Sequence, residues 1–260
     1  MDLEMEAIAN PWSIAILLNS VLLGLAWVLP KKLLTPAGYV HAWILGVLIW
    51  RSLGWRGYVI VMVYFLVGST VTRIGIAEKE AAGIAEKRSG ARGPENVWGS
   101  ALVATLCALG VVILRLMNPN IDHPWIAYLL LGYVASFATK LSDTTASEVG
   151  KAFGKRTFLI TTLKPVPRGT EGAVSLEGTL AGIVASVAIA LLGWAIQLID
   201  FGGAVLCVIA AFVATNAESV IGATLQDRFD WLSNELVNVI NTFIGAGVAI
   251  ALAVLWNTLI

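Results

Sequence analysis

The sequence has 260 residues, of which 58% are hydrophobic and only 13% are charged. A soluble domain contains roughly 45–50% apolar residues, so this composition excludes an ordinary soluble globular protein. The 17 Lys and Arg residues balance 17 Asp and Glu residues, so the chain lacks the basic excess that would indicate a nucleic-acid partner.

Apolar segments long enough to cross about 30 Å of hydrocarbon recur along the whole chain. Five clear segments and three shorter ones predict eight transmembrane helices: 12–29, 37–53, 57–73, 97–114, 125–141, 179–199, 202–224 and 236–258. The expected fold class is all-α, a polytopic transmembrane helical bundle that forms a single integral-membrane domain over residues 1–260. Seven spans result if the short segments 37–53 and 57–73 form one re-entrant unit.

The basic residues are divided unequally between the two sides of this bundle. With eight spans, 14 of the 17 Lys and Arg residues lie on one side, and only Arg51, Arg56 and Arg115 lie on the other. The positive-inside rule then predicts that both termini are outside and that loops 74–96 and 142–172 face the cytoplasm or stroma. Plasma, thylakoid and plastid membranes all fit this orientation.

Loop 74–96 mixes glycines with charged residues and ends at a predicted helix start. Its repeated Ala-Glu-Lys also fits an ordinary solvated helix. The segment from Ser89 to Pro94 differs, because a flexible Gly/Arg segment before a helix N-terminus can present a guanidinium and backbone N–H groups to phosphate. We therefore predict phosphate contact by this segment, through Arg92.

The segment from Ser142 to Lys155 carries the strongest chemical signal. Asp143 and Glu148, with hydroxyl-bearing residues between them, are followed by Lys151 and Lys155. These residues predict a magnesium-nucleotide site, because Mg²⁺ is usually held by one or two carboxylates together with phosphate oxygens and water.

Two local structures are compatible with this segment. The run from Thr145 to Glu148 fits a capping box, in which Glu148 would be the structural partner of a helix start. On a continuous helix, Asp143 and Glu148 would lie about 140° apart. A helix break or a helix start at this point would let both acids reach one ion.

The segment 163–172 contains two prolines and two glycines and cannot form a regular helix. We expect a tight turn within this segment. Lys164 and Arg168 are suited to bind phosphate, although the positive-inside effect alone would also place them here.

More polar residues approach the same side from later spans. Glu177 stands where the sixth span enters the membrane, two residues after Ser175, which fits a helix N-cap. The four-residue spacing of Gly178 and Gly182 predicts a close helix contact.

The seventh and eighth spans also carry polar residues. Asn216 and Glu218 lie within the seventh span, where an ionisable group is costly and is treated as functional by default; an acid satisfied by a neighbouring helix is the alternative. A stripe with helical spacing is expected to face the bundle: Asn234, Asn238 and Asn241.

Four motifs give the chain a family resemblance: GARGPENVWGS, SDTTASEVGK, ITTLKPVPRGTEGAVSLEGTLAG and NAESVIGATLQD. They resemble the integral-membrane family that includes the phytyl-phosphate kinases of tocopherol and phylloquinone synthesis. More distantly, the chain is similar to polyprenol and phytol kinases and to CTP-using phosphatidate cytidylyltransferases. The resemblance spans about residues 10–258.

This resemblance implies a phosphotransferase that uses a nucleoside triphosphate, with CTP favoured, and Mg²⁺ to convert a prenyl monophosphate into the diphosphate. It implies that Asp143 and Glu148 hold the metal and act in catalysis together with Lys164 and Arg168. The remaining residues expected to bind the nucleotide or phosphates are Arg92, Asn96, Thr144, Ser147, Lys151, Lys155, Gly169, Thr170, Glu177, Asn216 and Glu218.

Other functions also fit the sequence. A kinase of the free prenol or a lipid cytidylyltransferase would need similar groups. A membrane transporter or scaffold would also explain polar residues inside a bundle, but it does not explain why they gather on one side beside two basic, glycine-bearing loops. The expected partners are therefore a prenyl phosphate lipid, a nucleotide and the membrane, with no nucleic acid.

Overall fold

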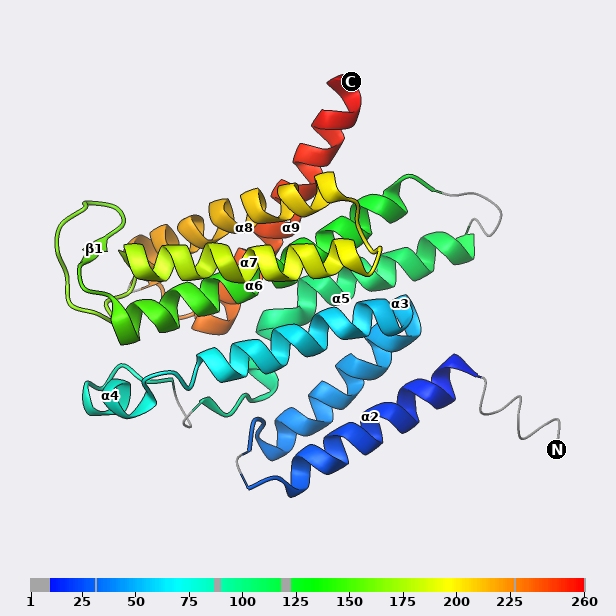
Figure 1. Cartoon of the computed structure of the whole chain (residues 1–260), viewed down its shortest axis with the longest axis horizontal. Helices are drawn as coiled ribbons and strands as arrows, with labels where there is room; N and C mark the ends of the chain where they lie inside the picture. Colours follow the sequence, from blue (N-terminus) through cyan, green and yellow to red (C-terminus); the bar gives the residue numbers. More distant parts are fainter. Residues whose placement is uncertain (1–9, 31, 87–89, 118–122, 227, 260) are drawn as a thin grey trace.

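The computed structural model describes residues 10–30, 32–86, 90–117, 123–226 and 228–259, and its long helices run along one another as a bundle (Figure 1). Over these residues the elements are α2 (Pro11–Val28), α3 (Pro36–Val71), α4 (Ile76–Ala81), α5 (Pro94–Met117), α6 (Trp125–Phe153), β1 (Thr157–Leu159), β2 (Ala173–Ser175), α7 (Leu176–Ala195), α8 (Phe201–Ile221), the π-helical turn η2 (Gly222–Gln226) and α9 (Asn234–Leu259). Within the described ranges, seven helices are long and apolar enough to cross a membrane. The predicted all-α transmembrane bundle is confirmed.

Helix α3 provides both of the short spans predicted over residues 37–73. Gly54 has φ 63° and ψ −155°, a backbone conformation that favours glycine, and the helix bends sharply there. Arg92 contacts both ends of α3: its carbonyl oxygen accepts a hydrogen bond from the Thr35 N–H at 3.0 Å, and its guanidinium lies beside Gly68. The helix therefore folds back on itself into two arms, each about 27 Å long at 1.5 Å per residue (Figure 1).

Helix α6 extends well beyond its predicted span of 125–141. It continues to Phe153 and holds the polar segment that the sequence assigned to the start of loop 142–172. That boundary was wrong, because the surrounding elements bury much of this polar stretch of α6, including Ser142, Asp143 and Glu148. The loop begins at Gly154, whose N–H donates to the Gly150 carbonyl oxygen at 3.0 Å.

Helices α6 and α7 lie in close contact. A Cβ on Gly178 would be 2.5 Å from the Ala146 carbonyl oxygen, and one on Gly182 would be 2.9 Å from the Ser142 carbonyl oxygen. The close approach predicted from the spacing of these two glycines is confirmed. It fixes the polar end of α6 against the start of α7.

A small antiparallel pair, β1 with β2, closes the loop between α6 and α7. Thr157 pairs with Ser175 and Leu159 with Ala173. The sequence did not predict this pair, but the expectation that segment 163–172 is not helical is confirmed. The pair holds the loop against the end of the bundle where α4 also lies (Figure 1).

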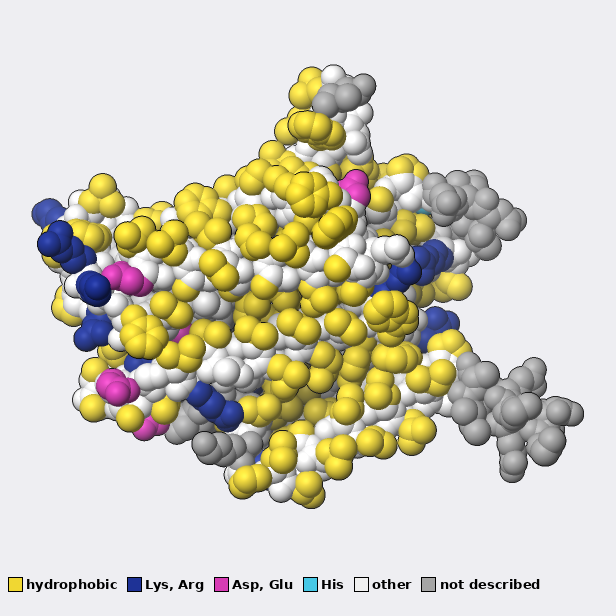
Figure 2. Space-filling model, viewed as in Figure 1, with side chains coloured by type: hydrophobic (Ala, Val, Ile, Leu, Met, Phe, Trp, Pro, Cys, Tyr) yellow, Lys and Arg dark blue, Asp and Glu magenta, His cyan; other side chains and the backbone are white. Residues whose placement is uncertain are grey.

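The outer surface is suited to lipid along the flanks of the helices. Figure 2 shows hydrophobic side chains covering this face of the bundle, while Lys and Arg gather mainly at its ends, most of them at the end that carries α4 and β1. Charged side chains that lie inside the bundle are collected near the same end, and they form the site described next.

Candidate active site

A buried lysine on α6 organises the first half of the site. Lys140 is 7% exposed, and its Nζ donates to the Asp143 Oδ2 at 2.6 Å and to the Asn238 Oδ1 of α9 at 2.6 Å. Asp143 is 5% exposed and also interacts electrostatically with Glu218 from α8. Three helices thus meet around one carboxylate, and the lysine compensates its charge inside the bundle.

A second buried pair lies on another face of α6. Lys79 of α4 forms an ion pair with Glu148, and both side chains are at most 2% exposed. Lys79 Nζ also donates to the Thr72 carbonyl oxygen at 2.8 Å, and Lys151 Nζ approaches the Glu148 Oε1 at 3.4 Å. Glu148 therefore ties the loop after α3 to the end of α6.

The capping box and the helix break are both wrong, and the continuous helix, which was also considered, is what the structure shows. Thr145 and Glu148 lie inside α6, so they form no capping box, and the helix is continuous across Asp143 and Glu148. The break that would bring these two acids to one ion does not occur. In the structure the two carboxylates have separate partners: Asp143 pairs with Lys140 and interacts with Glu218 of α8, whereas Glu148 pairs with Lys79.

Three basic residues from separated parts of the chain line a cavity of about 310 Å³, which we call the lysine cavity: Arg92, Lys140 and Lys151. Asn96, Thr144 and Asn238 add amide and hydroxyl groups, and Glu86, Glu171 and Glu235 also line it. Predicted phosphate-binding residues of loop 74–96 and of segment 142–155 therefore come together here. Ser89 lies outside the described residues.

Arg92 is held in place by both its backbone and its side chain. Its N–H donates to the Leu33 carbonyl oxygen at 3.0 Å, and its Nη1 donates to the Tyr64 hydroxyl at 2.7 Å. The guanidinium also lies over the rings of Tyr64 and Phe65. No ion pair among the described residues includes Arg92, so its charge is available to an anion in the cavity.

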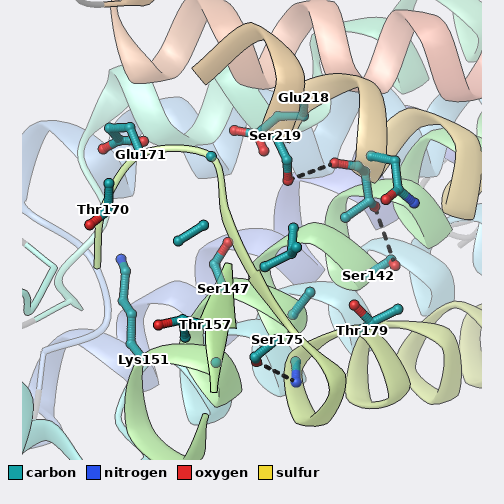
Figure 3. A pocket seen from close by; sticks show the side chains of 18 of the residues that line it. Ser142, Ser147, Lys151, Thr157, Thr170, Glu171, Ser175, Thr179, Glu218 and Ser219 are labelled. Carbon is teal, nitrogen blue, oxygen red and sulfur yellow. Dashed lines mark hydrogen bonds between the residues drawn. The ribbon is translucent and has the colours of Figure 1, made fainter. Parts of the chain in front are cut away.

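A smaller cavity of about 120 Å³ adjoins the first and is lined by α6, α7, α8 and the loop before β2. We call it the serine-rich cavity, after Ser142, Ser147, Ser175 and Ser219. Figure 3 shows Glu218 and Ser219 across the cavity from Ser147, with Lys151 reaching toward Thr170 and Glu171. Lys151, Gly169 and Glu171 line both cavities, so the two form one polar region.

Most of the nucleotide-binding residues predicted from the sequence line one of these two cavities. They are Arg92, Asn96, Thr144, Ser147, Lys151, Gly169, Thr170, Asn216 and Glu218. Asn216 also donates from its Nδ2 to the Phe212 carbonyl oxygen at 2.7 Å. The sequence motifs thus converge in space although they are far apart along the chain.

Four predicted residues lie at the edge of the site. Lys164 is exposed, and Arg168 donates to the Ala152 carbonyl oxygen at 3.1 Å near the end of α6. The Lys155 side chain is exposed, while its backbone N–H donates to the Glu177 carboxylate at 3.4 Å. None of the four lines either cavity, and the buried Asp143 and Glu148 do not line them either. Ser175 accepts a hydrogen bond from the Gly178 N–H, which confirms the predicted N-cap of α7.

Sequence reasoning missed two central lysines. Lys140 was counted only among the bases of the cytoplasmic side and Lys79 as part of a solvated helix, but both are buried and paired with acids. The three-residue spacing of Lys140 and Asp143 is a usable signal, since such residues are neighbours on a helix. Nothing local links Lys79 to Glu148, which lies 69 residues away.

The predicted stripe on α9 faces the bundle in part. Asn238 accepts a hydrogen bond from Lys140, and Asn241 is fully buried. Asn234 is exposed at the helix start, where its Oδ1 accepts from Gln226. The first residue of the stripe is therefore exposed, and the two later residues face the interior of the bundle.

Comparison with known proteins shows similarity along nearly the whole chain. The family described as Integral membrane protein DUF92 matches residues 19–246. An uncharacterized membrane protein of Synechocystis sp. is 66% identical over 247 residues, which cover 95% of this chain and 93% of that protein.

More distant relatives come from a plant and an archaeon. The protein VTE6, chloroplastic, of Arabidopsis thaliana is 44% identical over 245 residues, covering 93% of this chain and 72% of that protein. An uncharacterized membrane protein of Methanocaldococcus jannaschii is 33% identical over 218 residues, covering 83% of this chain and 84% of that protein. No solved structure matches the chain.

Proposed function

The chain belongs to the integral membrane protein family DUF92, and from that premise we propose that it is a phosphotransferase acting on a prenyl monophosphate. The proposed reaction moves the γ-phosphoryl group of a nucleoside triphosphate, with CTP favoured, onto phytyl phosphate to give phytyl diphosphate. The similarity to VTE6 and the four motifs shared with phytyl-phosphate kinases support a role of this type.

The observation that carries the proposal is the meeting of Arg92, Lys140 and Lys151 around one cavity at the polar end of a membrane bundle. Two phosphate-bearing substrates repel each other, so their reaction requires fixed positive charge between and around them. Such groups are supplied by loop 74–96 and by two different turns of α6. A transporter or scaffold gives no comparable reason for this convergence.

The proposed step needs positioning more than proton transfer. An oxygen of the acceptor phosphate, already an anion, forms a bond to the γ-phosphorus of the nucleotide. The bond from that phosphorus to the oxygen bridging to the β-phosphate breaks, and the nucleoside diphosphate leaves. Arg92, Lys140 and Lys151 would neutralise charge on the two phosphates and hold them in line.

Magnesium is part of the proposal, as the metal that accompanies the nucleotide. When bound, it would neutralise phosphate charge. Asp143 stays the favoured ligand, and Glu218 of α8 is the acid that interacts with it in the structure. Both carboxylates offer the hard oxygen ligands that Mg²⁺ prefers. Asp143 is paired with one lysine, Lys140, whereas Glu148 is paired with two, Lys79 and Lys151. We therefore expect Glu148 to act mainly by positioning these lysines.

The test is transfer of labelled phosphate in proteoliposomes. Protein reconstituted with γ-labelled CTP and phytyl phosphate should yield labelled phytyl diphosphate, and Asp143→Asn should abolish the product. Asp200→Asn is the matched control: this acid caps the start of α8, where its Oδ1 accepts from the Gly203 N–H. It should keep the activity, because asparagine is also a good N-cap.

Product identity separates the proposal from its rivals. Phytol in place of phytyl phosphate should give no product, whereas a kinase of the free alcohol would phosphorylate it. A cytidylyltransferase would leave the cytidine monophosphate unit on the lipid and release diphosphate. Absence of transfer from CTP, ATP, GTP and UTP alike would overturn the proposal.

A further inference from the structure

A third cavity, of about 400 Å³, lies beside the polar region between α2, the two arms of α3 and α5. We call it the apolar cavity, because nearly all of its lining is hydrocarbon, including Leu22, Leu45, Val61 and Phe65. Its volume lies within the usual range of small-molecule pockets, roughly 300–1,000 Å³. None of the chemistry proposed above uses it.

The apolar cavity meets the lysine cavity at three shared residues: Arg92, Asn96 and Ser100. Arg92 thus stands at a junction, with phosphate-binding groups on one side and a hydrocarbon-lined space on the other. The aromatic rings of Tyr64 and Phe65, over which its guanidinium lies, also line the apolar cavity. A ligand with an anionic head and an apolar tail matches this change of surroundings.

A buried hydrogen-bonded pair lines the apolar cavity at the Asn19 end of its α2 wall. The Tyr58 hydroxyl donates to the Asn19 Oδ1 at 3.0 Å, and Asn19 Nδ2 donates to the Ala15 carbonyl oxygen. On α2 the lining runs from Asn19 to Leu29, which corresponds to about 15 Å of helix. We call this Asn19–Tyr58 pair the floor of the cavity, because its two side chains fill the space between α2 and the second arm of α3 there.

The cavity is open toward the membrane along α2. Leu25 is 60% exposed and Val28 is 75% exposed, although both line the cavity. In a bilayer these exposed faces would be covered by hydrocarbon. A lipid could therefore enter sideways between α2 and its neighbours without exposing its tail to water.

We infer that the apolar cavity binds the isoprenoid chain of the phosphorylated lipid substrate, with the phosphate of that lipid at Arg92, and that the Asn19–Tyr58 floor limits the chain length accepted. The inference rests on the proposed function for the identity of the head group. One lipid molecule occupies the cavity at a time, because the cavity is a single pocket with one cationic residue, Arg92, at its mouth.

The first test places a large side chain inside the cavity. Ala42 lines it on the first arm of α3, and Ala42→Phe should lower kcat/KM for phytyl phosphate by about 10–100-fold, since lost complementarity of a methylene or more is worth that much. The same variant should keep its activity on geranyl phosphate, which reports that it folds. Ala37→Phe is the matched control, since Ala37 is exposed on the same arm and does not line the cavity.

A second variant approaches from the opposite wall. Ala26 lines the cavity on α2. In a series of geranyl, farnesyl, geranylgeranyl and phytyl phosphates, Ala26→Phe should likewise lower kcat/KM for the long chains and leave activity on the short ones. An unchanged profile in both cavity variants, with the wild-type protein active, would overturn the inference while leaving the proposed function intact.

A crosslinking measurement tests the site without turnover. A prenyl monophosphate carrying a diazirine at the end of its chain should label peptides of α2, α3 or α5, and excess phytyl phosphate should suppress the labelling. Arg92→Gln should weaken the labelling as well. Labelling confined to α7 or α8, or equal suppression by a phospholipid without a prenyl chain, would overturn the inference. Labelling in the cavity by a protein that transfers no phosphate would instead overturn only the proposed function.

Discussion

Helices α6 and α2 belong to the same bundle but meet very different surroundings. In the most apolar stretch of each helix, 67% of α6 is buried against 11% of α2. Helix α6 carries Lys140, Asp143 and Glu148 inside the protein, each with partners from other elements. In α2 only Ala15 and Asn19 are buried.

The difference shows how this protein divides two tasks. Charges inside a membrane bundle are tolerated only where protein surrounds and pairs them, so the polar chemistry belongs on the helix with the most neighbours. A helix that faces lipid can instead leave gaps between itself and neighbouring helices, because lipid acyl chains fill those gaps. The apolar cavity beside α2 and the polar region on α6 therefore follow from the same principle.

The largest expected effect comes from breaking the buried ion pair between Lys79 of α4 and Glu148 of α6. Lys79→Met leaves Glu148 without its closest partner and should lower the free energy of unfolding in detergent micelles by about 3–5 kcal/mol. The double variant Lys79→Met with Glu148→Leu should recover most of that loss. Lys155→Met, on an exposed side chain, is the control and should change stability by less than about 0.5 kcal/mol. A loss below about 1 kcal/mol for Lys79→Met would contradict this account of α6.

The next effect compares glycines in the two regions. Gly178→Ala would place a Cβ 2.5 Å from the Ala146 carbonyl oxygen and should destabilise the protein by about 1–3 kcal/mol. Gly24→Ala on α2 meets nothing within 4 Å and should be neutral or stabilising by up to about 1 kcal/mol, because alanine is the better helix former. Thermal unfolding of the two variants measures both effects. Equal shifts in the same direction would remove the contrast between α6 and α2.

The smallest effect tests how α2 is attached to the bundle. Tyr58→Phe removes the hydrogen bond to Asn19 and should cost about 0.6–1.7 kcal/mol, the range found for hydrogen bonds between membrane helices. Tyr128→Phe is the comparison, since its hydroxyl accepts a bond from Asn257 at an exposed position. Urea or detergent denaturation should show the greater loss for Tyr58→Phe. The reverse order would mean that the Asn19–Tyr58 pair does not fasten α2.

The spans were predictable because crossing hydrocarbon demands long apolar helices whatever the fold around them. The end of α6 was not, because its sequence turns polar after residue 141 while the helix continues to Phe153. Ser142, Asp143 and Glu148 are buried there, and Glu148 pairs with Lys79 of α4, which local hydropathy does not register. The only sign in the sequence that α3 folds back at Gly54 is the short interruption between the apolar segments 37–53 and 57–73.

The sequence predicted which residues belong to the candidate site better than it predicted which residues they contact. Arg92 and Lys151 were selected from motifs far apart, and both line the lysine cavity. Arg168 was also selected, yet it binds the carbonyl oxygens near the end of α6. Local sequence indicates which groups can bind phosphate. Whether a flexible side chain reaches the cavity depends on the tertiary contacts that position its loop.

By itself, the sequence determined that the chain is an all-α membrane bundle whose basic residues gather on one side, because hydropathy and charge act on each segment independently of its neighbours. Only the tertiary structure decided that Lys140 and Lys79 are buried and paired with acids. It also decided that Asp143 interacts with Glu218, whereas Glu148 pairs with Lys79. It alone placed a hydrocarbon-lined cavity behind Arg92. These features arise between helices, where the position of a side chain depends on contacts that no single stretch of sequence contains.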